Sequence, residues 1–471
     1  MLSKPKIGVL FLAGDSWWEA GICTAATGPY AGFLQQIEND VAAATAALAK
    51  DFTVISSGLL HTSQQIIDEA RRFTSEKVEA IVFCPIIWTN DPPVIDFIRE
   101  ANKVPLALWA YDPYGSILEY YKIEVWLRSS GPVSVQQVSS LFRNHEWDYA
   151  VIFGNEKDEG CLRELQAFLR AAAVKKSLTT TRIAVLPAPC RMVMGAWIDE
   201  KVLYEQFGVE LVHVSVQQFA EIAESISDAE AAEYVQWLKE HAKITNTPEE
   251  MLLMSAKHAL AMVRLTEELG LSGIALEDFH EDFYRILGVR PHLYHPRLGE
   301  LGCTVGLEAD VPGILSTLIV GRLAGHQAMF NEFYTIDKHR DLVLMGHPGM
   351  GELSVGDPAT FEVTPDLEFD ETQKRGAWIS YRAKPGPMTH FNLTPDGNRL
   401  KATAWTGEAL FGPRLMEGYA HMLVRPDTDA LPLFQKIVER GLVQHWGTVH
   451  GKIVPELRHF ARLTGLDLVV L

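Results

Sequence analysis

The chain has 471 residues, of which 47% are hydrophobic and 22% are charged. A domain commonly has about 150 residues, so this length predicts two or three domains with a large buried core. The 42 lysines and arginines are outnumbered by 60 aspartates and glutamates, which gives a net charge of -18. Because nucleic acids are held largely through positive charge, this balance argues against a nucleic-acid partner.

The cysteines and the apolar runs bear on the cellular compartment in which the protein is expected. The five cysteines are scattered and form no CxxC pair, so they suggest neither a disulfide framework nor a thiolate zinc site. The first apolar run stops at Asp15 without a cleavage pattern, and it is interpreted as a buried strand instead of a signal peptide. The most apolar later segment is interrupted by Arg322 and is too short to cross a bilayer. We therefore expect a cytoplasmic protein with no membrane partner.

Residues 1–175 alternate short apolar runs with longer amphipathic stretches. The apolar runs, which predict buried strands, are KIGVLFLAG, FTVISSG, EAIVFCP, VPLALWA and YAVIFGN. Between them, segments such as NDVAAATAALAKD and SQQIIDEARRFTSEK have apolar positions at helical spacing. Strand and helix in alternation predict a parallel sheet covered on both faces, and hence an N-terminal α/β domain.

The next two regions differ in texture. Residues 176–326 repeat the alternation less regularly, with strands predicted at TRIAVLPAP, VELVHVS and LSGIALEDF, and they predict a central α/β domain. Residues 327–471 contain short runs in which apolar and polar residues alternate, and turn-forming residues separate these runs, as in the hairpin sequence PDGN. This pattern is typical of antiparallel sheet, so we predict a C-terminal, mostly antiparallel, barrel-like β domain. The last residues, VPELRHFARLTGLDLVVL, return to helix and then strand.

Common nucleotide and hydrolase motifs are missing from the sequence. GHPGMG is rich in glycine, but ELSVGDPATFEV follows it instead of a helix, so it does not predict a dinucleotide-binding loop. There is no GxxxxGK phosphate loop and no GxSxG elbow. Nucleotide chemistry is therefore disfavoured.

Three carboxylates lie in apolar or aromatic surroundings. Glu308 and Asp310 precede a long apolar stretch that predicts a buried helix after Pro312. A buried, ionised carboxylate is costly without a cation, so these residues indicate a metal or another cationic partner; a solvated helix cap is the alternative. Glu332 lies in the segment FNEFY, where a surface loop and a functional site are equally good interpretations.

Histidines complete a candidate ligand set. His347 follows the apolar run LVLM and stands between a glycine and a proline, where a core histidine is the alternative. His445 lies next to Trp446, and either a loop position or replacement by His450 remains open. Two carboxylates and two imidazoles together would form an oxygen and nitrogen site suited to manganese, cobalt or magnesium.

At these residues the chain resembles the L-arabinose isomerase family, within the L-fucose and L-arabinose isomerase-like group. The resemblance extends from about residue 180 onward and rests on five ordered motifs. ALEDFH is similar to the family's FEDLH, LEAD to GEGD, NEFYT to MEDYT, LVLMGHPGMGE to LVLGAHMLEV, and VQHWGTVHGK to a double-histidine segment near the C-terminus.

The resemblance implies a metal-dependent ketol isomerase that interconverts an unphosphorylated aldose and ketose of the L-arabinose and L-ribulose type. The implied cofactor is a divalent metal, Mn²⁺ before Co²⁺ or Mg²⁺, and two glutamates transfer protons through an enediol. The implied metal ligands are Glu308, Glu332, His347 and His445, with Glu308 and Glu332 as the catalytic pair. The implied substrate-binding residues are Met192, Leu276, Tyr334 and Ser16.

The sequence also departs from the arabinose pattern. The family's GSQHLYG loop is replaced by AGDSWWEAG, so Ser16 and the two tryptophans Trp17 and Trp18 stand where glutamine and histidine are expected. Leu276 replaces a phenylalanine, and Gln444 replaces the first of two histidines. The groups for isomerisation are therefore retained better than the sugar pocket.

The family is a homo-oligomer, hexamer or trimer, in which a neighbouring subunit completes the site. That arrangement would let Trp17, Trp18 and Trp88 stack on a sugar, with burial in the core as the alternative for each of them. Two other functions remain open from the sequence: a sugar-binding or sensory protein on the same scaffold without catalysis, and a sugar epimerase or lyase.

Overall fold

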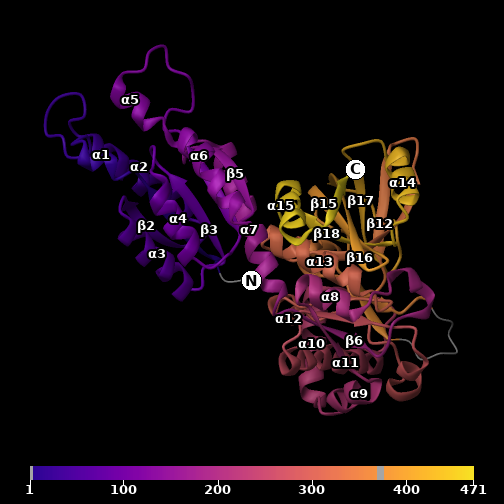
Figure 1. Ribbon diagram of the computed structural model, residues 1–471. Coiled ribbons are helices and arrows are strands. Elements are labelled where there is room, and N and C mark those ends of the chain that lie inside the picture. The colour runs from indigo at the N-terminus through magenta and orange to yellow at the C-terminus, as the bar shows by residue number, and fades with distance from the viewer. Residues whose placement is uncertain (1–3, 369–375) are drawn as a thin grey trace. The chain divides into compact units, whose positions relative to one another are not determined.

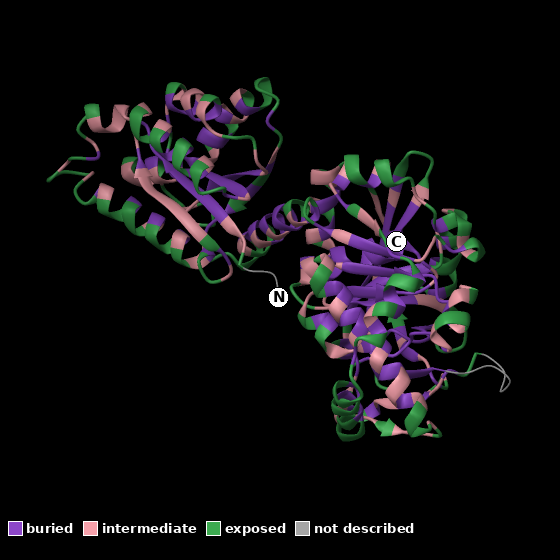
Figure 2. Cartoon of the chain, turned by 90° about the horizontal axis from the view of Figure 1, so that it is seen from below, coloured by how far each residue is buried: buried purple, intermediate pink, exposed green. Residues whose placement is uncertain are grey.

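The computed structural model describes residues 4–368 and 376–471 (Figure 1). The chain divides into two compact units, one that ends at Lys176 and one that runs from Ser177 to Leu471. Each unit has its own sheets, and buried residues concentrate in their strands (Figure 2).

The N-terminal unit is built on a parallel sheet with the strand order β2-β1-β3-β4-β5. Every position of β3 and β4 is buried, so both faces of the sheet are covered at its centre, as the continuous apolar runs predict, whereas Val151 and Phe153 on the edge strand β5 are exposed. The strands are β1 (Lys6–Leu12), β2 (Thr53–Leu60), β3 (Ala80–Pro85), β4 (Leu106–Tyr111) and β5 (Tyr149–Gly154). The helices are α1 (Ser16–Glu19), α2 (Phe33–Leu48), α3 (Ser63–Ser75), α4 (Asp91–Glu100), α5 (Ile123–Arg128), α6 (Gly131–Asn144) and α7 (Glu159–Leu178).

The second unit begins with another parallel sheet, in the order β10-β9-β6-β7. Its strands are β6 (Arg182–Leu186), β7 (Glu210–His213), β9 (Gly273–Leu276) and β10 (Thr304–Gly306). The helical segments are η1 (Arg191–Ala196), α8 (Glu200–Phe207), α9 (Val216–Glu224), α10 (Asp228–His241), α11 (Glu249–Leu269), η2 (Phe283–Leu287), α12 (Pro296–Glu300) and α13 (Val311–Ala324). The expected central α/β architecture is confirmed.

The same unit contains a closed, mostly antiparallel barrel. Its order is β15-β18-β11-β12-β17-β16, and the pairing of β15 with β16 closes it, while β19 adds to β16 in parallel. The strands are β11 (Met329–Asp337), β12 (Leu342–His347), β15 (Gly386–Asp396), β16 (Arg399–Leu410), β17 (Ala420–Pro426), β18 (His445–His450) and β19 (Asp467–Val470). The predicted barrel-like fold is therefore confirmed, and PDGN forms the hairpin between β15 and β16.

Smaller elements complete this unit. The sheet β14-β13-β8 consists of β8 (Lys243–Ile244), β13 (Glu362–Pro365) and β14 (Ala377–Ser380). The remaining helices are η3 (Leu353–Val355), η4 (Pro358–Thr360), α14 (Ala430–Glu439) and α15 (Val454–Thr464). Across residues 4–368 and 376–471, none of the helices combines the length and apolar character needed to cross a bilayer.

Helix α13 joins the central sheet to the barrel. It is buried without a break from Val311 to Gly321, because both faces of this apolar helix are covered. Strand β18 approaches so closely that a Cβ atom on Gly447 would lie 2.5 Å from the backbone nitrogen of Thr317. This contact places His445, two residues earlier in β18, beside the N-terminus of α13. The central sheet and the barrel thus share one compact unit, and the proposed domain boundary at residue 326 stays a prediction.

We predict that His258 makes the fold sensitive to acid. It is buried in α11 with no hydrogen-bond partner for Nδ1, and burial lowers its pKa to about 4. The unfolded chain takes up this proton below about pH 6.5 and the folded chain only near pH 4, so stability falls as pH drops through this window. The loss is about 2–3 kcal/mol for a shift of this size. Urea unfolding at pH 7.5 and pH 4.5 measures it.

The variant His258→Met is expected to lose less stability than the wild type between these two pH values, because methionine has no proton to gain. His339→Gln serves as the control, because His339 is exposed. An equal loss in the wild type and His258→Met would contradict the prediction.

Candidate metal and acid-base site

Three of the four predicted metal ligands meet in the second unit. Within the described part of the chain, Glu308, His347 and His445 form a group whose ligand atoms all lie within 4.8 Å of one another. Glu308 follows β10, His347 ends β12 and His445 begins β18. Residues separated by up to 137 positions along the chain are thus gathered by the barrel and the end of the central sheet.

The register of the barrel strands explains this meeting. Strand β11 lies between β12 and β18, and Glu332 on β11 stands opposite His445 on one side and Gly346 on the other. Directly opposite residues in antiparallel strands have Cβ atoms about 5 Å apart. Glu332 therefore lies between the two histidine-bearing strands, one residue from His347 in the register.

Hydrogen bonds fix the orientation of both imidazoles. The His445 Nδ1 atom lies 2.8 Å from Asp310 Oδ2, and the His347 Nδ1 atom lies 3.1 Å from the Pro348 carbonyl oxygen. Both partners are acceptors, so each Nδ1 carries a proton, and in its neutral form each ring has its lone pair on Nε2.

The two Nε2 atoms face each other at 3.3 Å, and Glu308 Oε2 lies 3.7 Å from the Nε2 of His445. Two lone pairs and a carboxylate directed at one point repel each other unless a positive charge lies between them. An N,N,O donor set of this kind fits a divalent transition metal, which binds the free nitrogen of a histidine oriented through its other nitrogen.

Burial and neighbouring charges shift the pKa values of Glu308, His347 and His445. Burial raises the pKa of Glu308 to about 7, with further raising by the charges of Glu332, Asp278 and Asp310, while His445 opposes the shift. Burial lowers the pKa of His347. For His445, burial alone would lower the pKa, but the hydrogen bond and charge of Asp310 and the neighbouring glutamates raise it. Such groups, desolvated together, are stabilised by a bound cation.

The structure distinguishes between the alternatives for Glu308, His347 and His445 that the sequence left open. The cap of α13 is Asp310, which accepts the Gly313 N–H at 2.8 Å, so Glu308 is not the capping residue. His347 is buried, as a core histidine would be, but its Nε2 belongs to the group. His450 lies at the far end of β18, where its Nε2 is 3.0 Å from the Lys384 carbonyl oxygen.

Glu332 is not a member of the three-residue group in the described chain. Its charge nevertheless acts on all three members: it adds to the raised pKa values of Glu308 and His445, and it opposes the lowering of the His347 pKa by burial. The pKa of Tyr334 is raised by burial and, next, by the neighbouring Glu332 carboxylate. The role of Glu332 as a ligand stays a prediction.

The predicted substrate-binding residues lie in different surroundings. Met192 lies on η1 with 69% of its surface exposed, and Tyr334 is 39% exposed on β11, whereas Leu276 is fully buried at the end of β9. Ser16 belongs to the N-terminal unit, where its hydroxyl lies 3.2 Å from the Asn90 side chain. Their contacts with a substrate stay predictions. Gln444, the substituted histidine position, donates to Glu308 Oε2 at 3.1 Å.

Sequence reasoning missed Asp278 and Arg290. Asp278 follows the carboxyl end of β9, and one of its oxygens accepts the backbone N–H of Glu308 at 2.9 Å. Arg290, fully buried, pairs with the other oxygen at 3.0 Å. The available signal was the position of Asp278, because polar residues at the carboxyl ends of parallel strands commonly form sites.

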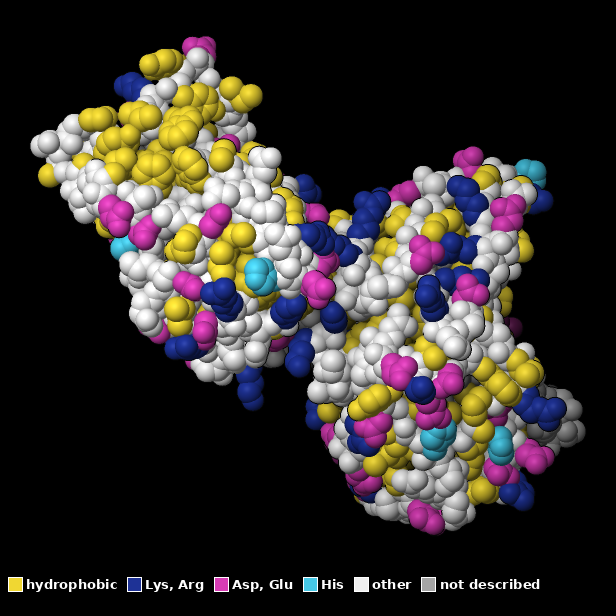
Figure 3. Space-filling view, in the orientation of Figure 1, with side chains coloured by type: hydrophobic (Ala, Val, Ile, Leu, Met, Phe, Trp, Pro, Cys, Tyr) yellow, Lys and Arg dark blue, Asp and Glu magenta, His cyan; other side chains and the backbone are white. Residues whose placement is uncertain are grey.

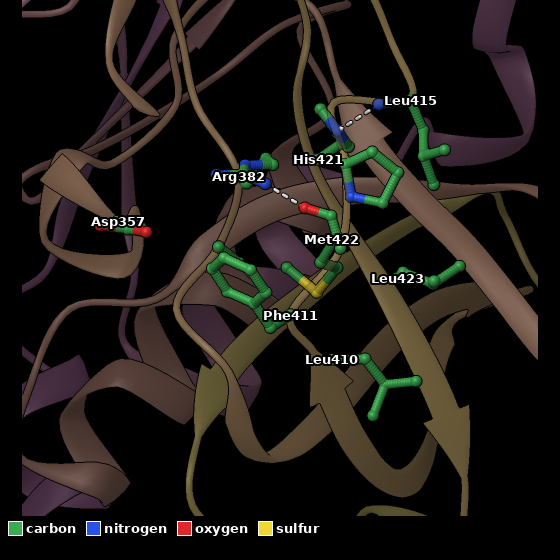
Figure 4. A pocket seen from close by; sticks show the side chains of 11 residues that line it. Asp357, Arg382, Leu410, Phe411, Leu415, His421, Met422 and Leu423 are labelled. Atoms are coloured by element: carbon green, nitrogen blue, oxygen red, sulfur yellow. Dashed lines mark hydrogen bonds between the residues drawn. The ribbon is translucent and has the colours of Figure 1, made fainter. Parts of the chain in front are cut away.

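A separate small hollow lies between β17 and the segment after β16 (Figure 4). The Arg382 guanidinium packs over the Phe411 ring at 5.2 Å, and His421 Nε2 accepts the Leu415 N–H at 3.1 Å. Its volume of about 10 Å³ holds about one water molecule. None of the predicted site residues lines this hollow, and a space of this size does not admit a sugar.

No family model matches this chain. Among curated proteins it is similar to a sulfoquinovose isomerase of Alkalicoccus urumqiensis, with 22% identity over 413 residues that cover 87% of this chain and 90% of the relative. A sulfoquinovose isomerase of Priestia megaterium is 24% identical over 395 residues, 79% of this chain and 86% of the relative. These relatives confirm the expected enzyme class, aldose–ketose isomerase, and they are not L-arabinose isomerases.

Among solved structures, the chain is similar to a solute-binding protein of Bacillus halodurans with bound myo-inositol. The identity is 15%, the match covers 69% of this chain and 91% of the other, and the TM-score is 0.18. A score this low carries no argument about fold or function.

We predict that the protein binds Mn²⁺ and that His445→Gln weakens this binding by at least about tenfold, because even the outer partners of metal ligands contribute this much. Calorimetric titration of Mn²⁺ into chelator-treated protein measures the affinity. His390→Gln is the matched control, since His390 is buried on β15 of the same barrel but outside the group. Equal Mn²⁺ affinities of His445→Gln and wild type would contradict the assignment.

Proposed function

We propose that this protein is a metal-dependent aldose–ketose isomerase with its reaction centre at Glu308, Glu332, His347 and His445. The observation that carries the proposal is the pair of facing Nε2 atoms, 3.3 Å apart, with the Glu308 carboxylate beside them. Mn²⁺ is the proposed metal, with Co²⁺ and Mg²⁺ as alternatives that the same oxygen and nitrogen donors can accept.

Glu332 is proposed as the fourth ligand and as the second acid-base group. Its register position opposite His445 and its effect on the pKa values of the three gathered residues support this role. Tyr334, two residues along the same strand and close enough for the Glu332 charge to raise its pKa, would help to orient this carboxylate.

Isomerisation of an aldose moves one proton between C2 and C1 and another between the two oxygens, through an enediol. A divalent cation held by Glu308, Glu332, His347 and His445 would act as a Lewis acid that stabilises the negative charge developing on the substrate. Glu308, with a pKa raised to about 7, can both accept and donate a proton near neutral pH. Glu308 and Glu332 would therefore relay the two protons.

The proposed substrate is sulfoquinovose, a sulfonated hexose, in place of an L-arabinose type sugar. Sulfoquinovose is the sugar named for the relatives that cover 79% to 87% of this chain. The departures from the arabinose pattern at Ser16, Trp17 and Trp18 support a different sugar pocket.

We further propose that the protein is a homo-oligomer, hexameric or trimeric, with the site at a subunit interface. A surface of exposed apolar residues supports this, and it gathers around α5 and the segment before it (Figure 3). Monomeric proteins rarely expose apolar surface of this density, so a second copy of the chain is the proposed occupant. The residues of this surface are Ile117, Tyr120, Ile123, Trp126 and Val133.

Glu308→Gln and Glu332→Gln are each expected to lower kcat by about 100- to 10,000-fold, because general acid-base catalysis contributes this much. Both variants should keep the wild-type circular dichroism spectrum, since glutamine has the same size. Ketose formation with Mn²⁺ is assayed on sulfoquinovose, L-arabinose, L-fucose and D-glucose.

Glu408→Gln is the control, because Glu408 is exposed on β16 of the same barrel. Wild-type turnover by Glu308→Gln or Glu332→Gln would refute the catalytic assignment. Turnover of L-arabinose without turnover of sulfoquinovose would refute the proposed substrate alone.

The double variant Ile123→Glu, Trp126→Glu is expected to shift the protein toward the monomer and to lower its activity, because charged side chains would have to be buried in the interface. Light scattering after size-exclusion chromatography gives the mass. Val438→Glu, at an exposed apolar residue of α14, is the control and should leave the mass unchanged. An unchanged mass of the double variant would contradict the proposed interface.

A further inference from the structure

The backbone turns sharply at the metal-facing glutamate. Glu308 and Ala309 have φ values of 57° and 46°, so two consecutive residues with side chains adopt the left-handed conformation that favours glycine. Such strain persists only where the surrounding structure enforces it, and it is concentrated at functional sites.

This turn directs two carboxylates at one imidazole. Glu308 Oε2 lies 3.7 Å from Nε2 of His445, and Asp310 Oδ2 lies 2.8 Å from Nδ1 of the same ring. Residues two positions apart thus reach opposite nitrogens of His445. An extended backbone at 308 and 309 would separate the two carboxylates and lose this geometry.

Two hydrogen bonds from the end of β9 hold the turn. The Ala309 N–H donates to the Leu276 carbonyl oxygen at 2.9 Å, and the Glu308 N–H donates to Asp278 Oδ1 at 2.9 Å. The first is an ordinary backbone bond that many residue types would preserve. The second depends on the side chain of Asp278.

Asp278 is itself fixed on its other side. Its Oδ2 atom accepts Arg290 Nη1 at 3.0 Å and lies 3.2 Å from His292 Nε2, and all three side chains are buried. Burial would raise the pKa of Asp278, but the hydrogen bond from His292 and the charges of His292 and Arg290 lower it. The carboxylate therefore stays ionised, with one oxygen for Arg290 and His292 and the other for Glu308.

We propose that Asp278 is a positioning residue: it holds the left-handed turn at Glu308 and Ala309 and so directs the Glu308 carboxylate at the metal. This inference rests on the proposed function, in which Glu308 binds the metal and takes part in catalysis. Asp278 itself does not touch the reacting atoms. The buried ions around Arg290 are, in this arrangement, the support that keeps Asp278 charged and oriented.

The variant Asp278→Asn separates this role from general stability. An asparagine has one acceptor oxygen, and Arg290 with His292 would attract it, which leaves the amide NH₂ facing the Glu308 N–H. Two donors in contact repel each other, so the turn would be displaced. We expect Mn²⁺ affinity to fall at least about tenfold. We also expect kcat to fall by a similar factor, with KM changed less than threefold.

Asp366→Asn is the matched control. Asp366 Oδ2 accepts Arg290 Nε at 2.7 Å, so this variant disturbs the same buried arginine by the same chemical change. Asp366 has no contact with the turn among its described hydrogen bonds. We expect Asp366→Asn to lower the melting temperature about as much as Asp278→Asn does. Its Mn²⁺ affinity should stay within threefold of the wild type.

Asp278→Glu provides a second test should Asp278→Asn not fold, because it keeps the charge next to Arg290 while displacing the oxygen that accepts the Glu308 N–H. It too is expected to weaken Mn²⁺ binding at least tenfold. A crystal structure of either Asp278 variant should show Glu308 outside the left-handed region. Wild-type Mn²⁺ affinity in a folded Asp278 variant, or an equal loss in Asp366→Asn, overturns the inference and leaves the proposed function standing. Absence of Mn²⁺ binding in the wild type overturns both.

Discussion

The two Nε2 lone pairs of His347 and His445, 3.3 Å apart, are the constraint on which the candidate site depends. Each ring is oriented by an acceptor on its Nδ1, the Pro348 carbonyl for one and Asp310 for the other. Neither ring can turn its protonated nitrogen toward its neighbour without losing that bond in a buried environment. The fold therefore maintains a point of high electron density that a cation would stabilise.

Helix α13 links the orientation of His445 to the rest of the fold. Asp310 uses one oxygen to cap the helix at Gly313 and the other to hold His445, so the position of the imidazole is tied to the start of the helix. Farther along, the close approach of Gly447 to Thr317 fixes β18 against the same helix. The segment of β18 that begins at His445 is thereby held at two points, by a hydrogen bond and by packing.

Most of the architecture could be predicted because it follows from local patterns. Continuous apolar runs gave the parallel strands, alternation with turn signals gave the barrel, and the stretch after Pro312 gave the buried helix α13. The meeting of Glu308, His347 and His445 could be expected only from the resemblance to a family, because strand order and register in the barrel are set by long-range pairing. The support of the site was missed for the same reason: the ion pairs of Arg290 join residues 12 to 78 positions away.

Buried and exposed residues of the second unit differ in how much a substitution would disturb the fold. In the candidate site, Asp310, His445 and Asp278 are buried, Asp310 is hydrogen-bonded to His445, and Asp278 accepts the Glu308 N–H, so a change in one of them leaves an unsatisfied partner. Met192 and Tyr334 are exposed on the surface of the same unit, where substitution costs little stability. Under the proposed function, sugar choice could therefore change through exposed residues such as Met192 and Tyr334, while the buried hydrogen bonds around Glu308 and His445 are kept.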